Sequence, residues 1–224
     1  TYSIISLHDM YMLCPSINMI YEEKYCKINE KRDCTKCLNR IHGINNNILN
    51  NWKKVCGNVL KKFDKIIVPS ENTKDRYLEE YKNLNIDVIE HGVNIIKVSK
   101  NENDDDKISN IAFVGVMVPH KGSKILKDMI QNKHDNIRIH LFGSTQDKML
   151  MKNKSNYIYH GKYEREELPN LLVKNNIKLV CIFSPIPETY SYTLTEAFMA
   201  KIPVISFDIG AVAERIQKDD LGWI

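Results

Sequence analysis

Short apolar runs alternate with helix-like segments through the second half of the chain, and this alternation constrains the fold more than any other feature. The pattern predicts strands at residues 111–115, 137–143, 157–161, 177–183 and 204–207. It predicts helices between and after them near residues 122–132, 145–151, 164–174, 191–200 and 211–217. Strands that alternate with helices of about ten residues form βαβ units and a parallel sheet. The nearly continuous apolar runs at 177–183 and 203–207 are typical of central strands covered on both faces, so we predict an open α/β fold.

The first hundred residues show fewer regular elements. Short strands are predicted at residues 3–8, 65–69 and 87–90. Helices are predicted at 44–63 and from a Ser70 N-cap to about Tyr81. Residues 14–43 form an irregular stretch, long enough that we expect it to be functional or cross-linked. The acidic run at 101–106 is predicted to be a solvated linker rather than a carboxylate metal site.

Composition excludes several classes of protein. The 224 residues are 43% hydrophobic and 27% charged, which excludes wholesale disorder and collagen-like structure. No apolar run approaches the ~20 residues of a membrane-spanning helix, and residues 1–20 lack a signal-peptide pattern. The net charge of +4 lies in residues 1–100, which hold 16 basic and 12 acidic side chains. This surplus is too weak to indicate nucleic-acid binding, but it favours an anionic ligand or a membrane surface. We expect a cytoplasmic protein with peripheral association at the inner face of a membrane, lacking both ends of a longer chain.

Four of the six cysteines lie within 24 residues of one another. The candidate metal ligands are Cys14, Cys26, Cys34 and Cys37. Cys34-Thr-Lys-Cys37 has the paired spacing of one half of a tetrahedral zinc site, in which thiolates are preferred ligands. Three interpretations stay open: a structural zinc, reduced thiols without metal, or a disulfide, which would require an oxidising compartment. Cys56 and Cys181 lie in apolar patterns and are predicted to be core residues.

Three loops after predicted strands are candidates for ligand binding, because ligands of open α/β sheets gather at the carboxyl ends of strands. In the loop at 115–122, Lys121 beside Gly122 can neutralise a phosphate at a helix entrance or belong to an ordinary turn. In the loop at 208–211, Gly210 leaves room for a phosphate or is a plain turn glycine. Neither a Walker loop nor a G-x-G-x-x-G fingerprint is present.

The loop at 184–193 carries the strongest signal. Glu188 precedes the predicted helix and Glu196 lies in its first turns, with seven residues between them. The free amides near Ser191 can bind a diphosphate between the two carboxylates, which can accept hydrogen bonds from hydroxyl groups. The alternative is a helix-capping Glu188 and a solvated Glu196. The strand–loop–helix context favours the binding interpretation.

Together these segments resemble retaining glycosyltransferases with the GT-B fold, and within them the large family four. The E-x7-E segment is Glu188–Glu196, and Pro203-Val204-Ile205 and Gly210-Ala211 follow it. Further matching segments occur in the family's order over nearly the whole chain: Leu7-His8-Asp9, Cys14-Pro15, Ile67–Ser70, His91–Asn94, Phe113–Gly115, Pro119–Gly122, Leu141–Gly143, His160-Gly161 and Glu166–Pro169.

The resemblance implies two Rossmann-like domains with a donor nucleotide sugar in the cleft between them. Residues 1–94 would be the C-terminal part of the acceptor-side domain with a Cys-rich insertion. Residues 95–224 would be most of the donor-binding domain, truncated at its C-terminal end. The protein would transfer a sugar, with retention, from a nucleoside diphosphate sugar to a saccharide or lipid-linked acceptor. Catalysis would require no cofactor.

The resemblance also implies a role for each site residue. Glu188 would contact the donor sugar, Lys121 the diphosphate, and His8 would lie close to the transferred sugar. Glu196 would bind the ribose hydroxyls. The remaining donor contacts would come from Tyr190, Ser191, Tyr192 and Thr193, from Gly115 and Gly143, and from Tyr163 near the base.

Two residues depart from the family's pattern. Val116 stands where an arginine often provides a second phosphate ligand, and Lys201 stands at a usual glycine. The glycine-rich loop expected early in the acceptor-side domain is also absent from this sequence. Two other functions stay open: a nucleotide-sugar epimerase with the same fold, and a non-catalytic nucleotide-sugar-binding or scaffold module.

Overall fold

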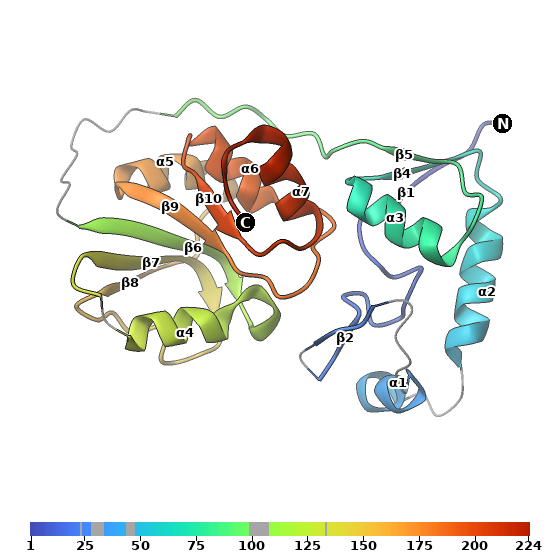
Figure 1. Ribbon diagram of the computed structural model, residues 1–224, viewed down its shortest axis with the longest axis horizontal. Helices are drawn as coiled ribbons and strands as arrows, with labels where there is room; N and C mark the ends of the chain where they lie inside the picture. Colours follow the sequence, from blue (N-terminus) through green and yellow to red (C-terminus); the bar gives the residue numbers. More distant parts are fainter. Residues whose placement is uncertain (23, 28–33, 44–47, 99–107, 133) are drawn as a thin grey trace. The chain divides into compact units, whose positions relative to one another are not determined.

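The computed structural model describes residues 1–22, 24–27, 34–43, 48–98, 108–132 and 134–224. These residues form two compact units (Figure 1). Unit 1 comprises Thr1–Gly92 together with Ile186–Tyr190, and unit 2 comprises Val93–Pro185 and Ser191–Ile224. The acidic run at 101–106 and the first four residues of the helix predicted at 44–63 lie outside the described residues.

A six-stranded sheet forms the centre of unit 2. Its strands are β6 (Ser109–Met117), β7 (Ile137–Thr145), β8 (Tyr157–Gly161), β9 (Ile177–Ile182), β10 (Val204–Ser206) and β11 (Gly222–Trp223). Their order is β11-β10-β9-β6-β7-β8, and the paired strands run parallel. Counted from β6, this is the order 3-2-1-4-5-6 of dinucleotide-binding folds. The predicted open α/β fold is confirmed, with β9 and β10 flanked by strands on both sides.

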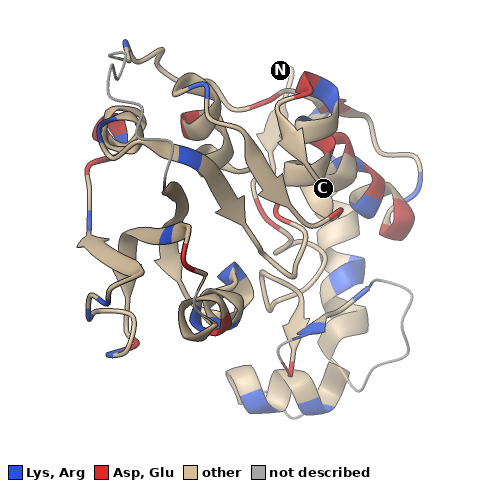
Figure 2. Ribbon diagram, turned by 60° about the vertical axis from the view of Figure 1, so that its left-hand side comes forward, with Lys and Arg blue, Asp and Glu red and all other residues tan. Residues whose placement is uncertain are grey.

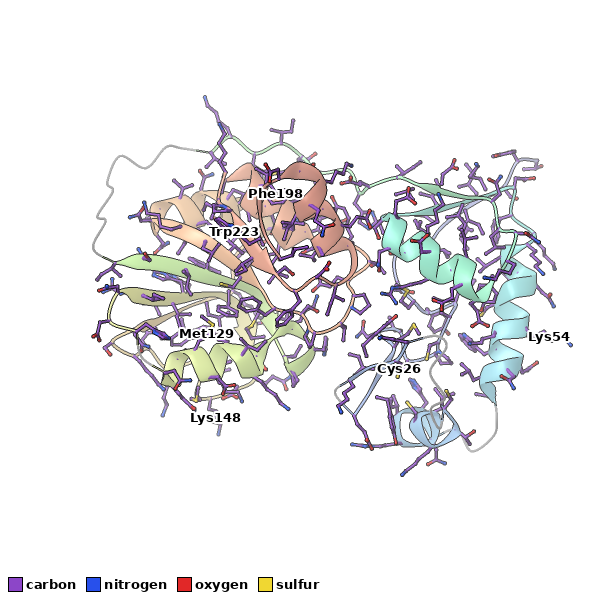
Figure 3. All side chains as sticks on the ribbon, in the orientation of Figure 1. Cys26, Lys54, Met129, Lys148, Phe198 and Trp223 are labelled. Atoms are coloured by element: carbon purple, nitrogen blue, oxygen red, sulfur yellow. The ribbon has the colours of Figure 1, made fainter. Side chains whose placement is uncertain are left out.

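Helices cover both faces of this sheet (Figure 1). The helices are α4 (Ser123–Gln131), α5 (Leu168–Lys174), α6 (Tyr192–Met199) and α7 (Gly210–Asp219). Ala112 and Val114 of β6 belong to the buried cluster formed with α5, α6 and α7. The alternate residue Phe113 belongs to the cluster that includes Leu126 of α4. Because neighbouring strand residues point to opposite faces, the two clusters lie on opposite sides of the sheet. Figure 3 shows Met129 of α4 and Phe198 of α6 among the side chains that fill these layers.

Unit 1 contains a three-stranded parallel sheet of β1 (Ile4–Ser6), β4 (Lys65–Val68) and β5 (Ile86–Val88), in the order β1-β4-β5. Its longer helices are α2 (Ile48–Leu60) and α3 (Glu71–Glu80). Ser70 is the N-cap of α3, as predicted, and its Oγ accepts a hydrogen bond from the Thr73 amide at 3.2 Å. Buried Tyr77 of α3 donates its hydroxyl to the Asp9 carbonyl at 2.9 Å, which fixes the segment after β1.

Two sequence-based expectations about secondary structure are wrong. The helix expected at 145–151 is a turn, because β7 extends to Thr145 and the Asp147 carboxylate accepts the Met149 amide at 2.9 Å. The stretch at 14–43 is less irregular than expected. It contains the antiparallel pair β2 (Ile20–Tyr21) and β3 (Lys24–Tyr25) and the helix α1 (Cys34–His42), which buries Cys37 and Leu38.

Charged side chains of both signs are distributed over the helices and loops (Figure 2). Among the described residues, no helix is long and apolar enough to cross a membrane. Cys56 and Cys181 are buried in the hydrophobic clusters of unit 1 and unit 2, which confirms that they are core residues.

Candidate functional site

The order in which successive strands are added to the unit 2 sheet reverses between β6 and β9. These strands are neighbours, but β6 leads toward β7 on one side and β9 leads toward β10 on the other. Open α/β sheets bind ligands at such a switch point, outside the carboxyl ends of the strands. The loops that leave β6 and β9 at this edge are the first and second candidate loops of the sequence.

The two loops are in direct contact within unit 2. The Ser184 hydroxyl after β9 donates to the His120 carbonyl after β6 at 3.0 Å. Gly122 has φ +87°, and a Cβ added there would come within 2.6 Å of the Phe183 carbonyl oxygen. Only glycine fits this close approach. Lys121 is half-buried in the short 3-10 turn Pro119–Lys121, directly before the first turn of α4.

Gly115 and Gly143 are paired in register near the carboxyl ends of β6 and β7. Both have positive φ, +105° for Gly115 and +137° for Gly143. A Cβ on Gly143 would lie 1.9 Å from the Gly115 carbonyl oxygen, whereas a Cβ on Gly115 would meet nothing within 4 Å. Gly143 is therefore required by strand packing, and Gly115 leaves open space beside the sheet edge.

Helix α6 presents its N-terminus at the same edge. Ser191 is its N-cap and accepts the Leu194 amide through Oγ at 3.4 Å. The buried Arg215 of α7 donates to the Ser191 carbonyl at 3.0 Å and to the Thr195 hydroxyl at 2.9 Å. Thr193 lies in this first turn. The arrangement adds a guanidinium charge to the positive end of the α6 dipole, which favours an anionic ligand.

Glu196 is 4% exposed and forms an ion pair with Arg165, whose Nε lies 2.9 Å from Oε1. The Arg165 guanidinium also stacks 3.6 Å above the Tyr192 ring. Burial raises the pKa of the Glu196 carboxyl, and the Arg165 charge and hydrogen bond oppose that rise. Burial, followed by the Glu196 charge, raises the pKa of Tyr163 to about 12. The structure thus brings together three predicted residues, Tyr163, Tyr192 and Glu196.

A histidine pair lies on neighbouring strands of the unit 2 sheet, with His140 buried and His160 exposed. His140 of β7 is 3% exposed, and its Nδ1 lies 2.9 Å from Nε2 of His160 in β8. Its other nitrogen, Nε2, lies 3.3 Å from the Asn110 side-chain oxygen. The His160 ring stacks on the Phe142 ring, with the ring centroids 4.1 Å apart. Burial, followed by the nearby His160 and Arg138 charges, lowers the pKa of His140 to about 4, so this ring is neutral at pH 7. Burial also lowers the pKa of His160.

The remaining predicted residues belong to unit 1. The segment Ile186–Tyr190, which carries Glu188, packs at the carboxyl edge of the unit 1 sheet. Thr189 donates to the His8 carbonyl at 2.7 Å, and Ser70 donates to the Thr189 carbonyl at 3.0 Å. Tyr190 is buried, and its ring meets the His91 ring edge-on, with the ring centroids 4.7 Å apart. His91 in turn approaches His8, with 3.4 Å between His91 Nε2 and His8 Nδ1. Glu188 and His8 are thus held in one compact unit, each after a strand end.

Sequence reasoning missed Arg165, Arg215 and His140 as parts of the site, whereas the segment from His160 to Tyr163 was predicted to lie near the base. Arg165 had a usable signal, because it follows Tyr163 by two residues in a loop after a predicted strand. Arg215 and His140 had none, since a polar residue in a helix or strand is most often exposed.

Comparisons with known proteins agree with this geometry. Residues 93–224, more than half of the chain, match the family model of glycosyl transferases group 1. No curated protein sequence matches the chain significantly.

Several solved structures share the fold. A variant of TarM from S. aureus, in complex with fondaparinux, alpha-GlcNAc-glycerol and UDP, is 21% identical with a TM-score of 0.60, over 78% of this chain and 36% of that one. Sucrose-phosphate synthase from Thermosynechococcus elongatus is 16% identical with a TM-score of 0.63, over 81% of this chain and 51% of that one. HepE from Anabaena, in complex with UDP and glucose, is 16% identical with a TM-score of 0.63, over 94% of this chain and 54% of that one.

The chain therefore spans between about a third and just over half of the length of these three structures. At these identities the likeness shows the fold, which is the α/β fold of GT-B glycosyltransferases. Together with the family match over unit 2, the switch-point geometry leads to one conclusion: the chain belongs to the group 1 glycosyl transferases.

Proposed function

We propose that the protein transfers a sugar from a nucleoside diphosphate sugar to a saccharide or lipid-linked acceptor, with retention of configuration. The observation that carries the proposal is the switch point of unit 2, where Ser184 ties the loops after β6 and β9 together beside the N-terminus of α6. The proposal assigns to one ligand the positive end of α6, Lys121 and the buried Glu196 carboxylate. A nucleotide sugar requires these three kinds of group for its diphosphate and hydroxyls.

In this proposal the diphosphate binds to Lys121 and to the amides of the first turn of α6, around Ser191 to Thr193. When the bond to the sugar breaks, negative charge develops on the departing diphosphate. Fixed positive groups lower the barrier, because they are oriented before the charge appears. Arg215 supports this role by holding the α6 N-cap in place and adding its own charge.

The nucleoside binds next to the diphosphate. Glu196 accepts hydrogen bonds from the ribose hydroxyls as a carboxylate, and Arg165 favours that form because it opposes the rise in pKa that burial causes. Tyr163 lies near the base. Gly115 supports this pose through the open space beside it.

Glu188 and Tyr190 contact the donor, Glu188 at the sugar, and His8 lies close to the transferred sugar. The contacts of the segment at 186–190 support these roles. Thr189 donates a hydrogen bond to the His8 carbonyl, and the Tyr190 ring contacts the His91 ring. Retention in this proposal uses no protein nucleophile. The basic surplus of residues 1–100 favours an anionic acceptor or a peripheral contact with a membrane surface.

A thermal-shift panel of UDP-, GDP- and dTDP-sugars tests the donor site. UDP-glucose and UDP-GlcNAc come first, because UDP is bound in the TarM and HepE structures. A donor at 100 times its Kd should stabilise the protein by about 2.7 kcal/mol and raise Tm by roughly 5–10 °C. Lys121→Ala and Glu196→Gln should lose most of that shift.

The matched control is Lys148→Ala, an exposed lysine in the turn of unit 2 labelled in Figure 3, which should keep the full shift. If no nucleotide sugar raises Tm, the donor site is wrong. If a donor binds but is neither hydrolysed nor transferred, the chain is a non-catalytic binding module. Conversion of the donor to its epimer would indicate an epimerase.

A further inference from the structure

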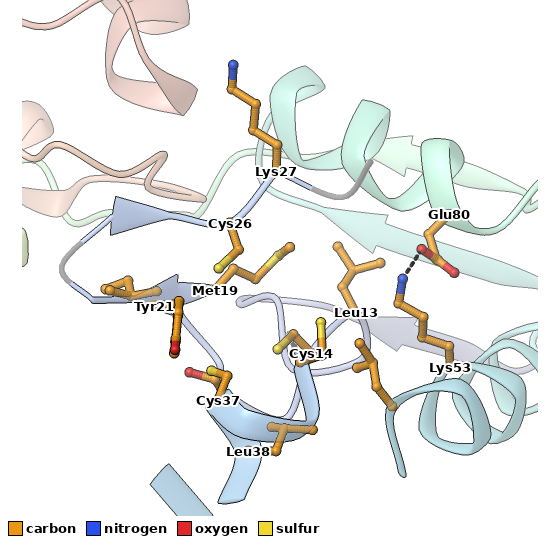
Figure 4. Close-up of a pocket in the computed structure, with 14 residues that line it drawn as sticks. Leu13, Cys14, Met19, Tyr21, Cys26, Lys27, Cys37, Leu38, Lys53 and Glu80 are labelled. Carbon is orange, nitrogen blue, oxygen red and sulfur yellow. Dashed lines mark hydrogen bonds and ion pairs between the residues drawn. The ribbon is translucent and has the colours of Figure 1, made fainter. Parts of the chain in front are cut away.

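The four clustered cysteines line one cavity in unit 1 (Figure 4). Cys14, Cys26, Cys34 and Cys37 contribute to its wall, beside apolar neighbours that include Met19 and Leu38. Figure 4 shows the side chains of Cys14, Cys26 and Cys37 around the same space. Cys56 is buried in the same unit but is not part of this wall. The grouping therefore selects the four cysteines that are clustered in the sequence.

Three separate pieces of backbone bring these thiols together. The Cys14 amide donates to the Met10 carbonyl at 2.9 Å in the turns that follow β1. Cys26 comes directly after β3, and its amide donates to the Met19 carbonyl at 2.7 Å. Cys34 and Cys37 lie three residues apart on α1, a spacing that places them on one face of the helix.

None of the six cysteines, all of which the structure describes, forms a disulfide. The four that line the cavity are therefore reduced thiols, the form from which zinc thiolates are made.

The segment that carries them is built from short elements, and Cys14, Met19, Tyr25 and Cys26 connect it to the main hydrophobic cluster of unit 1. It contains two strands of two residues each and the nine-residue helix α1. Cys37 and Leu38 of α1 are buried but are not members of the main hydrophobic cluster of unit 1. Small segments without a core of their own are commonly held by a metal or by disulfides.

We propose that Cys14, Cys26, Cys34 and Cys37 bind one structural Zn²⁺ as thiolates. Each thiol releases its proton to solvent on binding, so four protons leave as one Zn²⁺ enters and the site carries a net charge of about −2. Helix α1 also carries Lys36 and Arg40, and Figure 2 shows basic residues on this helix. The metal joins the turn after β1, the β2–β3 pair and α1.

Binding requires a small rearrangement. Among the described residues, no three His, Cys, Asp or Glu side chains are already arranged to hold a metal ion. The four sulfurs share a cavity, but they must converge to about 2.3 Å from the zinc. The proposal therefore requires the cysteine side chains to change between staggered rotamers when the metal binds. The proposal does not depend on the transferase activity.

The test is elemental analysis of the purified, reduced full chain, followed by Co²⁺ substitution. About one zinc per chain is expected, together with the thiolate-to-cobalt charge-transfer and tetrahedral d–d absorption bands of a four-sulfur site. Chelation should lower Tm by several degrees, and added Zn²⁺ should restore it. Cys37→Ser should lose the metal, whereas Cys56→Ser should retain it.

The cobalt spectrum of the wild-type chain decides the question even if Cys37→Ser does not fold. A chain that binds neither Zn²⁺ nor Co²⁺ after reduction would overturn the proposal. Native disulfides among these four cysteines, or bound iron with sulfide, would overturn it as well. A metal that survives in Cys37→Ser but is lost in Cys56→Ser would show that the ligands are wrongly assigned.

Discussion

The ion pair with Arg165 favours the charged form of the Glu196 carboxyl. The carboxyl is almost fully buried, and burial alone favours the protonated form. Arg165 is itself about half exposed, with a side-chain exposure of 47%, and is held over Tyr192. The ribose-binding role proposed for Glu196 therefore rests on a neighbour that no motif identifies. Sequence spacing predicts the carboxylate but not the residue that keeps it ionised.

We expect Arg165→Ala to make donor binding depend on pH. Without the guanidinium, the pKa of Glu196 rises further, so the carboxyl stays protonated to higher pH. Donor affinity should fall by roughly tenfold near neutral pH and recover as pH rises through the new pKa. Arg165→Lys keeps a positive charge and should show a smaller loss. Titration calorimetry of the best donor from pH 6 to 9 measures this; equal loss at every pH would mean that Arg165 acts only by packing.

His140 should make unit 2 sensitive to acid. Its pKa is near its ordinary value of 6.5 when the chain is unfolded and about 4 when folded. The unfolded state therefore binds more protons between these values, and stability falls as pH drops from 6.5 to 4, by up to roughly 3 kcal/mol. His140→Phe removes this proton uptake, so its free energy of unfolding should change less over the same range. Urea unfolding at several pH values measures how the free energy of unfolding changes with pH in the wild type and in His140→Phe. The same pH dependence in both proteins would contradict the proton uptake assigned to His140.

The elements that the sequence predicts well are those with strong apolar periodicity. Strands β6, β7, β9 and β10 and helices α6 and α7 lie where the apolar pattern predicts them, because both faces of this sheet are buried. The failures have local causes. Residues 145–151 contain helix-forming side chains, but the Asp147 carboxylate binds the Met149 amide and favours a turn. Helix α1 is polar apart from its buried face, so its pattern is weak.

The end of α6 explains one departure from the family pattern. Lys201 has φ +57°, and the Ile202 amide donates to the Ala197 carbonyl while the Lys201 amide donates to Phe198. These are the two hydrogen bonds of a Schellman motif, whose left-handed residue is usually glycine. We expect Lys201→Gly to stabilise the protein by about 0.5–1 kcal/mol and Lys201→Ala to give no such gain. Thermal unfolding measures both; a less stable glycine variant would contradict this interpretation.

Variants of the paired glycines Gly115 and Gly143, in β6 and β7, distinguish an effect on sheet packing from an effect on ligand binding. Gly143→Ala forces a Cβ against the Gly115 carbonyl and should destabilise the sheet by several kcal/mol. Gly115→Ala has a similar positive φ but open space, so it should cost only about 1 kcal/mol of strain. Gly115→Ala should nevertheless weaken donor binding, because its methyl enters the space assigned to the ligand. Unfolding and donor titration together test this, and normal donor binding by Gly115→Ala would move the ligand elsewhere.

At the scale of the whole molecule, the sequence predicts an α/β chain and the candidate ligand-binding loops. It does not predict that Ile186–Tyr190, inserted in the second half of the chain, packs with the first half. That contact depends on hydrogen bonds from Ser70 and Thr189, two ordinary polar residues whose partners are more than 100 residues away. Long-range contacts of this kind leave no local pattern.

Turnover of the donor tests the central claim most directly. The protein should consume the nucleotide sugar that stabilises it most and release the nucleoside diphosphate. The transferred sugar should keep its anomeric configuration, as followed by NMR. Glu188→Gln should bind that donor with similar affinity but lose most of its turnover. Normal turnover by Glu188→Gln, or an inverted product from the wild-type protein, would contradict this account.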